Sequence, residues 1–94
     1  MQSIELVVTN PTGLHARPAT LFVELANRFT SRITVENLDR GKGPVDAKSI
    51  LFLLTVGAST GHRIRLSADG PDEAEAIDAL RTAVEAGLGE SSHG

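Results

Sequence analysis

The chain of 94 residues contains no cysteine, tryptophan or tyrosine, and it has only three phenylalanines. The lack of cysteine excludes disulfide bonds, thiolate catalysis and cysteine-ligated metal sites. So few aromatic rings leave little surface on which nucleic-acid bases could stack. The net charge of −3 also differs from the concentrated basic charge of proteins that bind a phosphate backbone. We therefore expect no nucleic acid among the partners.

Long hydrophobic runs are missing as well. The longest apolar run, residues 50–56, is interrupted by Thr55 and is much shorter than the ~20 residues that span a bilayer. The N-terminus shows neither the basic region nor the continuous apolar stretch of an export signal. We expect no membrane insertion and a cytoplasmic location. The length fits one domain, which we place at residues 1–88, followed by a flexible polar tail at residues 89–94.

Alternation of apolar and polar residues predicts strands at residues 4–8, 33–36 and 64–68. The polar, glycine-bearing stretch at residues 37–44 predicts a hairpin loop, with a short returning strand at residues 45–47. Arg63 and Arg65 alternate with the apolar positions of the third strand. These two arginines, together with Arg81, are predicted to lie on a solvated face.

Helical periodicity begins after the turn-forming residues 10–13 and predicts a core-facing helix from near His15 to Asn27 or Arg28. Residues 50–54 fit either a buried strand or a short helix. Ser49, a favoured N-cap residue, supports the helix, and Phe52 and Leu53 are its predicted core residues.

Gly70 and Pro71 open a last predicted helix, whose acidic first turn complements the helix dipole. The acidic residues of that turn are Asp72, Glu73 and Glu75, and the apolar stripe comprises Ile77, Leu80, Val84 and Leu88. The predicted order is strand, helix, strand, strand, short helix, strand, helix. This order indicates the α+β class, with helices covering one face of an antiparallel sheet.

The segment Gly13–Ala19 combines a histidine with features that bind anions. If His15 caps the first helix, Ala16 and Arg17 supply free backbone N–H groups, whereas Pro18 has none. The Arg17 guanidinium can add charge-assisted hydrogen bonds. The sequence therefore predicts a phosphate seat beside the imidazole of His15.

The residues Gly13-Leu14-His15-Ala16-Arg17-Pro18-Ala19 resemble the active-site signature of the HPr family, the histidine-containing phosphocarriers of the bacterial phosphoenolpyruvate-dependent sugar phosphotransferase system. The likeness extends from about Ile4 to Leu88. It implies an open-faced β-sandwich of order βαββαβα, in which three helices cover a four-stranded antiparallel sheet.

The resemblance implies a phosphoryl carrier rather than an enzyme. Enzyme I would phosphorylate His15 on Nδ1, forming a pros-phosphohistidine, and an enzyme IIA domain would receive the group during sugar uptake. Arg17 would orient the phosphate, and the amides of Ala16 and Arg17 would bind it. We expect a monomer that needs no cofactor and no metal, with His62 and His93 as surface residues.

A second segment, Ala47-Lys48-Ser49-Ile50-Leu51, resembles the surroundings of the family's regulatory serine. This likeness makes Ser49 a target of the HPr serine kinase/phosphorylase, and it places Ile50, Leu51 and Leu54 in an apolar patch close to His15 that partners contact. The residues alone equally allow Ser49 as a plain N-cap and the three apolar side chains as core. The sequence departs from the family's pattern at two places. The loop at residues 37–44 is longer, and Asp46, which would weaken recognition by the serine kinase, occupies a position where small neutral residues are common.

Two other functions remain open at this point. One is a regulatory binding module that acts through phosphorylated Ser49 on a transcriptional regulator. The other is a carrier in a nitrogen-linked phosphorelay. The presence of both His15 and Arg17 argues against the first, and the Arg17-Pro18 pair looks closer to the sugar branch.

Overall fold

The computed structural model describes residues 1–90 of the chain. The order of its elements is the predicted one: β1 Gln2–Val7, α1 Ala16–Ala26, β2 Arg32–Asn37, β3 Lys42–Asp46, α2 Ile50–Thr55, β4 Arg63–Asp69 and α3 Glu73–Glu85. Within this range, no helix combines the length and the apolarity that crossing a bilayer requires.

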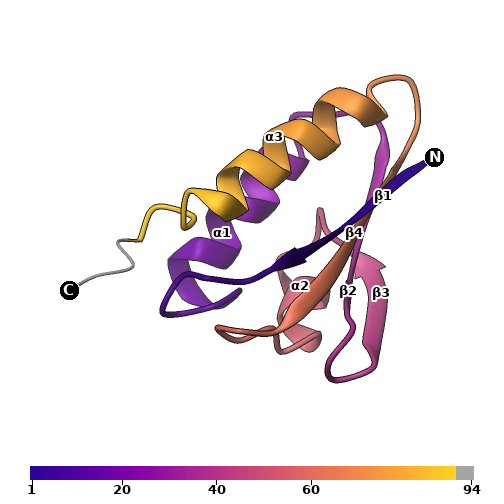
Figure 1. Ribbon diagram of the computed structural model, residues 1–94. Helices are drawn as coiled ribbons and strands as arrows, with labels where there is room; N and C mark the ends of the chain where they lie inside the picture. The colour runs from indigo at the N-terminus through magenta and orange to yellow at the C-terminus, as the bar shows by residue number, and fades with distance from the viewer. Residues whose placement is uncertain (91–94) are drawn as a thin grey trace.

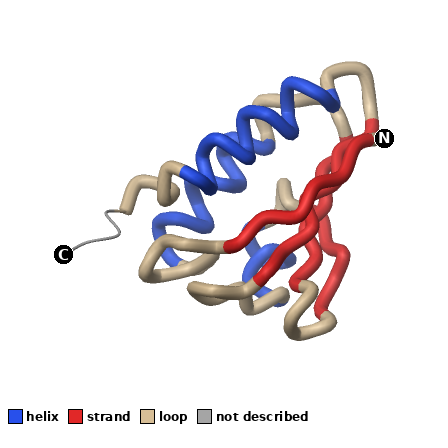
Figure 2. The backbone as a smooth tube through the Cα atoms, in the orientation of Figure 1, coloured by secondary structure: helices blue, strands red, loops and turns tan. Residues whose placement is uncertain are grey.

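The four strands form one antiparallel sheet in the order β1-β4-β2-β3. Figure 1 shows α1 and α3 lying side by side along the sheet, and Figure 2 shows all three helices on the same side of it. The predicted α+β open-faced sandwich is confirmed. Strand order, which spacing along the chain does not determine, places β4 between β1 and β2.

The core lies between the sheet and the helices. Alternate residues of β2 and β4 point into it, as the period of two requires. Phe22 of α1 and Leu80 of α3 pack over this face, and both are fully buried. The fully buried strand residues are Ile33, Val35, Ile64 and Leu66.

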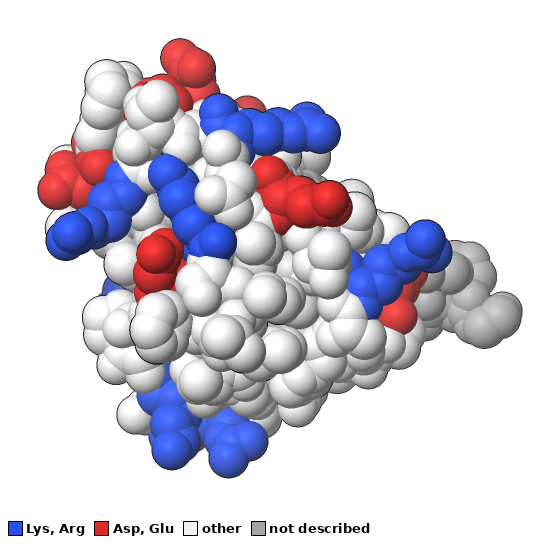
Figure 3. Space-filling view, turned by 180° about the vertical axis from the view of Figure 1, so that it is seen from behind, with Lys and Arg blue, Asp and Glu red and all other residues white. Residues whose placement is uncertain are grey.

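The opposite face of the sheet is charged. Register places Arg65 of β4 between Glu5 of β1 and Glu36 of β2, and its guanidinium lies 3.5 Å from the Glu5 carboxylate and 3.3 Å from that of Glu36. Such exposed pairs contribute about 0–1 kcal/mol each. On the surface seen from behind the view of Figure 1, basic and acidic side chains lie next to one another around a wide area without charged residues (Figure 3).

Residues 50–55 form the helix α2 and not a strand. Ser49 is its N-cap, and its Oγ accepts a hydrogen bond from the Phe52 amide at 3.3 Å. Leu53 is fully buried, but Phe52 is 56% exposed, so its prediction as a core residue is wrong. Successive helical residues point about 100° apart, so this short helix buries one of these two neighbours and exposes the other.

The hairpin between β2 and β3 is tighter than predicted. The side-chain oxygen of buried Asn37 accepts hydrogen bonds from the amides of Asp39 and Arg40, each at 3.1 Å. These bonds reverse the chain within a few residues of the end of β2. The returning strand consequently begins at Lys42, earlier than the predicted start at Val45, and it ends before Ala47.

The first turn of α3 does more than complement the dipole. The carboxylate of Asp72 accepts hydrogen bonds from the amides of Thr30 and Ser31, each at 2.9 Å, and from the Ser31 hydroxyl. The Glu73 carboxylate accepts one from the Gly70 amide at 3.1 Å. Asp72 and Glu73 therefore also fasten the start of α3 to neighbouring segments, a role that the predicted dipole interaction does not include.

Acid unfolding should report the Asp72 contacts. The Ser31 hydroxyl and the amides of Thr30 and Ser31 lower the pKa of Asp72 to about 2, below the value of 3.8 for a free side chain. A carboxyl whose pKa is lower in the folded state adds stability above pH 4, and that stability is lost as the pH falls toward 2. In Asp72→Asn, the urea midpoint should fall less steeply between pH 4 and 2 than in the wild type. Glu75→Gln, which removes an exposed carboxylate from the same turn, should keep the wild-type slope, and equal slopes in all three proteins would contradict the assignment.

The chain after α3 turns back onto α1. Gly87 has a left-handed φ of 88°, its amide donates to the Val84 carbonyl, and the Leu88 amide donates to the Ala83 carbonyl, both at 3.0 Å. This is the Schellman pattern of helix ends. Residues 89 and 90 of the predicted tail are therefore held in the packed structure, and the remaining four, residues 91–94 with His93, lie outside the described residues.

Candidate functional site

His15 is the N-cap residue of α1, as predicted. Its backbone is extended, with φ −136° and ψ 162°, and its carbonyl accepts from the Ala19 amide at 3.4 Å. The side chain makes no capping hydrogen bond, and the residue is half-buried. The imidazole therefore lies at the start of α1 but does not cap the helix through its side chain.

The loop before His15 is fixed by a close backbone contact. Gly13 has a left-handed φ of 74°, and a Cβ at this position would lie 2.5 Å from the carbonyl oxygen of Ala58. The next amide, that of the fully buried Leu14, donates to the same carbonyl at 2.9 Å. Glycine at position 13 lets the loop approach the segment after α2, and this approach sets the position of His15.

The first-turn amides of Ala16 and Arg17 have no hydrogen-bond partner within residues 1–90. Together with the helix dipole they form an electropositive end beside His15. Ala16 has a φ of 52°, in the left-handed region that a residue with a Cβ occupies at a cost of about 1–2 kcal/mol. Sequence reasoning found these two amides but gave no sign of this strained backbone.

Arg17 is exposed, and it takes part in no ion pair with any described carboxylate. Arg17 follows His15 by two residues and lies in the first turn of the same helix. The structure thus leaves this positive charge available to an anion at the helix start, as a phosphate seat requires.

Ser49 lies at the other end of the α1–α2 pair. The Asn27 side chain at the end of α1 donates to the Lys48 carbonyl at 3.1 Å, just before α2 begins. At the opposite end, the contact between Leu14 and Ala58 joins the start of α1 to the segment after α2. The helix α2 therefore runs from Ser49 toward the His15 loop.

Asp46 helps to shape the approach to Ser49. Its carboxylate accepts from the Lys48 amide at 2.9 Å, and its carbonyl accepts from the Ser49 amide at 3.3 Å. The Lys48 ammonium donates to the Phe29 carbonyl at 2.6 Å. Asp46 thus places a negative charge within three residues of the serine.

The exposed side of α2 is apolar. Leu51 is 76% exposed, and Ile50 and Leu54 are 38% and 39% exposed, so the alternative that these three are core residues is wrong. Phe52 joins them, and we call these four residues the α2 apolar surface. Exposed apolar groups clustered on one short helix mark a surface for interaction with another molecule.

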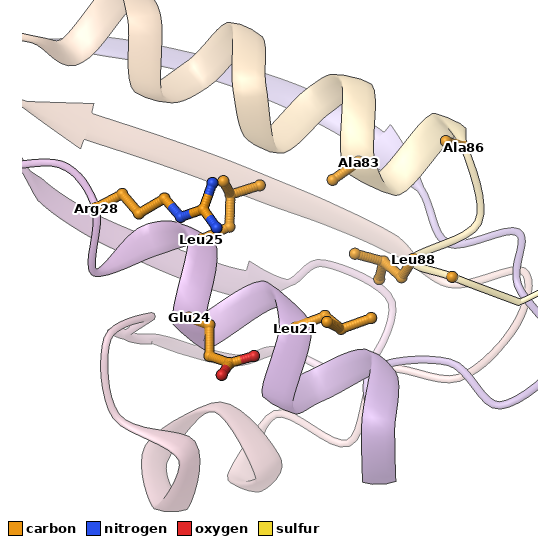
Figure 4. Close-up of a pocket in the computed structure, with 8 residues that line it drawn as sticks. Leu21, Glu24, Leu25, Arg28, Ala83, Ala86 and Leu88 are labelled. Atoms are coloured by element: carbon orange, nitrogen blue, oxygen red, sulfur yellow. The ribbon is translucent and has the colours of Figure 1, made fainter.

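A groove with a volume of about 300 Å³ lies elsewhere, between α1 and α3 (Figure 4). None of the predicted site residues lines it. Its lining residues are Leu21, Glu24, Leu25, Arg28, Ala83, Ala86, Leu88 and Gly89. This groove is therefore separate from the site at His15.

His62, which the sequence predicts as a surface residue, contacts two neighbouring residues through its ring. It is half-buried, and its Nδ1 lies 3.1 Å from the Ser59 amide and 3.2 Å from the side-chain nitrogen of Asn37. Both neighbours are donors, so Nδ1 accepts. His62 orders the loop after α2, a role that no local pattern indicates.

Comparison with known proteins identifies the family. The family model of the PTS HPr component phosphorylation site matches residues 2–86. The chain belongs to this family, the HPr phosphocarriers of the phosphotransferase system, which confirms the resemblance seen in the sequence.

Three relatives illustrate the likeness. The multiphosphoryl transfer protein of Salmonella typhimurium is 43% identical over 90 residues, which cover 96% of this chain and 24% of that protein, so the chain spans about a quarter of this relative's length. The structure of HPr-C-His from Thermoanaerobacter tengcongensis has a TM-score of 0.90 and 45% identity, and the match covers 97% of this chain and 99% of that one. A structure of the Bacillus subtilis catabolite repression protein Crh, described as a swapped dimer, has a TM-score of 0.70 and 43% identity, covering 92% and 95%.

Proposed function

We propose that this chain accepts a phosphoryl group on Nδ1 of His15 from enzyme I and passes it to an enzyme IIA domain during sugar uptake. The observation that carries the proposal is the placement of His15 at the N-cap of α1, with its ring free of capping contacts and two first-turn amides without partners within residues 1–90. Membership in a family of phosphocarriers supports it.

The helix start suits a transient phosphoryl group. The Nδ1 lone pair of His15 attacks phosphorus, an N–P bond forms, and the bond from phosphorus to the donor breaks. The phosphoryl oxygens then face the amides of Ala16 and Arg17, where the helix dipole contributes about 0.3–1 kcal/mol. Hydrogen bonds from the Arg17 guanidinium contribute about 1.5–3 kcal/mol more. Such moderate stabilisation allows the group to leave again, and these residues supply it without a cofactor.

The α2 apolar surface is where we place enzyme I and enzyme IIA. It lies beside the His15 loop, because the segment that follows α2 contacts that loop through Ala58. We propose that the chain works as a carrier rather than as an enzyme and that it does so in the cytoplasm. The structures of relatives described as dimers, among them the swapped dimer of Crh, stand against the monomer that the sequence led us to expect.

The direct test is to incubate the protein with phosphoenolpyruvate, magnesium and enzyme I. We expect one phosphoryl group per chain that is labile in acid and stable in base. Peptide mass spectrometry should map it to His15, and long-range proton–nitrogen NMR should place it on Nδ1. A group on another residue, or no group at all, would overturn the proposal.

Replacing Leu51 with glutamate should weaken docking. Leu51 is the most exposed residue of the α2 apolar surface, and a charge there must be desolvated against the partner. We expect the KM for enzyme I to rise about tenfold or more with little change in kcat, as for a central interface residue. Val7→Glu is the matched control, because Val7 is half exposed and lies on β1. Equal effects of the two changes would contradict a docking role for α2.

Ser49 is proposed as a regulatory phosphorylation site. A phosphate on an N-cap residue is compatible with the helix dipole, and here it would add about two negative charges beside Ile50 and Leu51. Incubation with ATP and the HPr serine kinase/phosphorylase should label the wild type but not Ser49→Ala, and the labelled protein should accept phosphate from enzyme I more slowly. Asp46→Ser should be labelled faster than the wild type. Label that does not depend on Ser49 would refute this role.

A second function, binding of a transcriptional regulator through phosphorylated Ser49, is supported by the likeness to Crh, which is described as a catabolite repression protein. It uses the same α2 apolar surface and does not need His15. A pull-down of the regulator that requires phosphorylated Ser49 and persists in His15→Ala would establish it beside the carrier function.

A further inference from the structure

We propose that Glu90 is a positioning residue for phosphoryl transfer, which it serves by holding the loop that carries His15. The inference rests on the proposed carrier function, because a positioned imidazole matters only if the ring takes up the phosphoryl group. Glu90 lies after α3, 75 positions from His15 in the chain, and it reaches the loop through its side chain.

The Glu90 carboxylate makes three hydrogen bonds to this loop. Its Oε1 accepts from the Asn10 side-chain nitrogen and from the Thr12 amide, each at 2.9 Å, and its Oε2 accepts from the Thr12 hydroxyl at 2.6 Å. The Thr12 hydroxyl and the Asn10 amide lower the pKa of Glu90, so the carboxylate stays ionised at neutral pH. Both oxygens are engaged, and the contact joins the segment after α3 to the turn before α1.

Asn10 links Glu90 to the residues just before His15. It is fully buried, and the nitrogen that donates to Glu90 also donates to the Gly13 carbonyl at 3.0 Å. Its side-chain oxygen has no partner among the described residues. The amide cannot be turned over, because its oxygen would then face a carbonyl and a carboxylate oxygen. Glu90 therefore fixes Asn10, Asn10 fixes Gly13, and Gly13 lies two residues before His15.

The backbone holds Glu90 in place. The left-handed turn at Gly87 redirects the chain, Leu88 is only 4% exposed, and the Glu90 amide donates to the Gly87 carbonyl at 2.9 Å. On its other side the loop is held by the Thr60 hydroxyl, which donates to the Pro11 carbonyl at 2.9 Å. Loss of the carboxylate would leave the loop held from one side only.

A loosened loop should slow transfer without weakening docking. The imidazole and the amides of Ala16 and Arg17 must meet the phosphoryl group together, and a misplacement of 1 Å at a reacting group can lower a rate about 100-fold. Among the described residues, the hydrogen bonds of Glu90 go to Asn10, Thr12 and Gly87 and none goes to the α2 apolar surface, so that surface should keep its shape. We expect about a tenfold lower kcat in Glu90→Ala, with the KM for enzyme I within about twofold of the wild-type value.

The experiment compares transfer from phosphorylated enzyme I in four proteins at a temperature where all are folded: wild type, Glu90→Ala, Glu90→Gln and Glu85→Ala. Glutamine keeps an oxygen that can accept from Thr12, so its kcat should be intermediate. Glu85→Ala removes an exposed carboxylate from the last residue of α3 and should match the wild type. A kcat of Glu90→Ala equal to the wild type, or a change in KM alone, would overturn the proposal even if the melting temperature falls.

Amide NMR of the same proteins separates this inference from the proposed function. In Glu90→Ala, the resonances of residues 10–17 should shift or broaden, whereas in Glu85→Ala they should not. If the wild type accepts no phosphoryl group, the carrier function fails. If it does accept one but these resonances and kcat are unchanged in Glu90→Ala, only the positioning role fails.

Discussion

Replacement of His15 with alanine is expected to reduce labelling by phosphoenolpyruvate and enzyme I to background while leaving the fold intact. The proposed N–P bond needs a ring nitrogen at position 15, and neither Ala16 nor Arg17 offers a nucleophile that could take its place. The side chain of His15 makes no capping hydrogen bond, so its removal should change stability by no more than about 0.5 kcal/mol. Acid-labile label and the thermal unfolding midpoint are the two measurements.

His62→Ala is the control for this prediction. His62 is also half-buried, but its ring accepts hydrogen bonds in the loop after α2 and does not lie at a helix start. We expect His62→Ala to keep its label, although its loop loses contacts. Label that survives in His15→Ala, or that disappears equally from both variants, would show that the acceptor has been assigned to the wrong residue.

The parts of the site that the sequence predicted are contiguous in the chain. Turn-forming residues at positions 10–13 stop the first strand, and helical periodicity starts directly after them, so local rules place His15 at a helix start. Ala16 and Arg17 follow from that placement. The left-handed backbone of Ala16 does not, because alanine disfavours this conformation and only its tertiary surroundings can impose it.

The strands were predictable where one face is buried. Alternation in β2 and β4 identified the residues that point into the core. The start of β3 could not be predicted, because it depends on how many residues the turn after β2 contains. Buried Asn37 makes this turn short through two side-chain hydrogen bonds. A polar stretch that contains glycine does not show by itself how much of it becomes strand.

Contacts made by carboxylates between distant segments escaped prediction. Asp72 holds Thr30 and Ser31 more than 40 positions away, and Glu90 holds Asn10 and Thr12. Periodicity and capping rules describe neighbours along the chain and contain no information on such pairs. The glycines at positions 87 and 89 are the one local sign that the residues after α3 form an ordered turn rather than a tail.

Burial was ambiguous in α2, and a matched pair of substitutions tests how the structure resolves it. Phe22 is fully buried in α1, whereas Phe52 is 56% exposed in α2. Truncating a buried phenylalanine removes its transfer free energy and leaves a cavity, so Phe22→Ala should lower the free energy of unfolding by about 3–5 kcal/mol. Because small domains have about 5–15 kcal/mol in total, this single change should leave the protein marginally folded. Urea unfolding monitored by circular dichroism measures the free energy of unfolding of the wild type and of Phe22→Ala.

Phe52→Ala removes the same atoms from the surface and should cost only about 0.5 kcal/mol. Phe52→Ala should instead weaken recognition, because Phe52 belongs to the α2 apolar surface. We expect a higher KM for enzyme I and an unfolding midpoint near the wild-type value. A large loss of stability in Phe52→Ala would mean that α2 packs with this face inward. The docking proposal would then fail together with the burial assignment, because both depend on which side of this short helix faces the solvent.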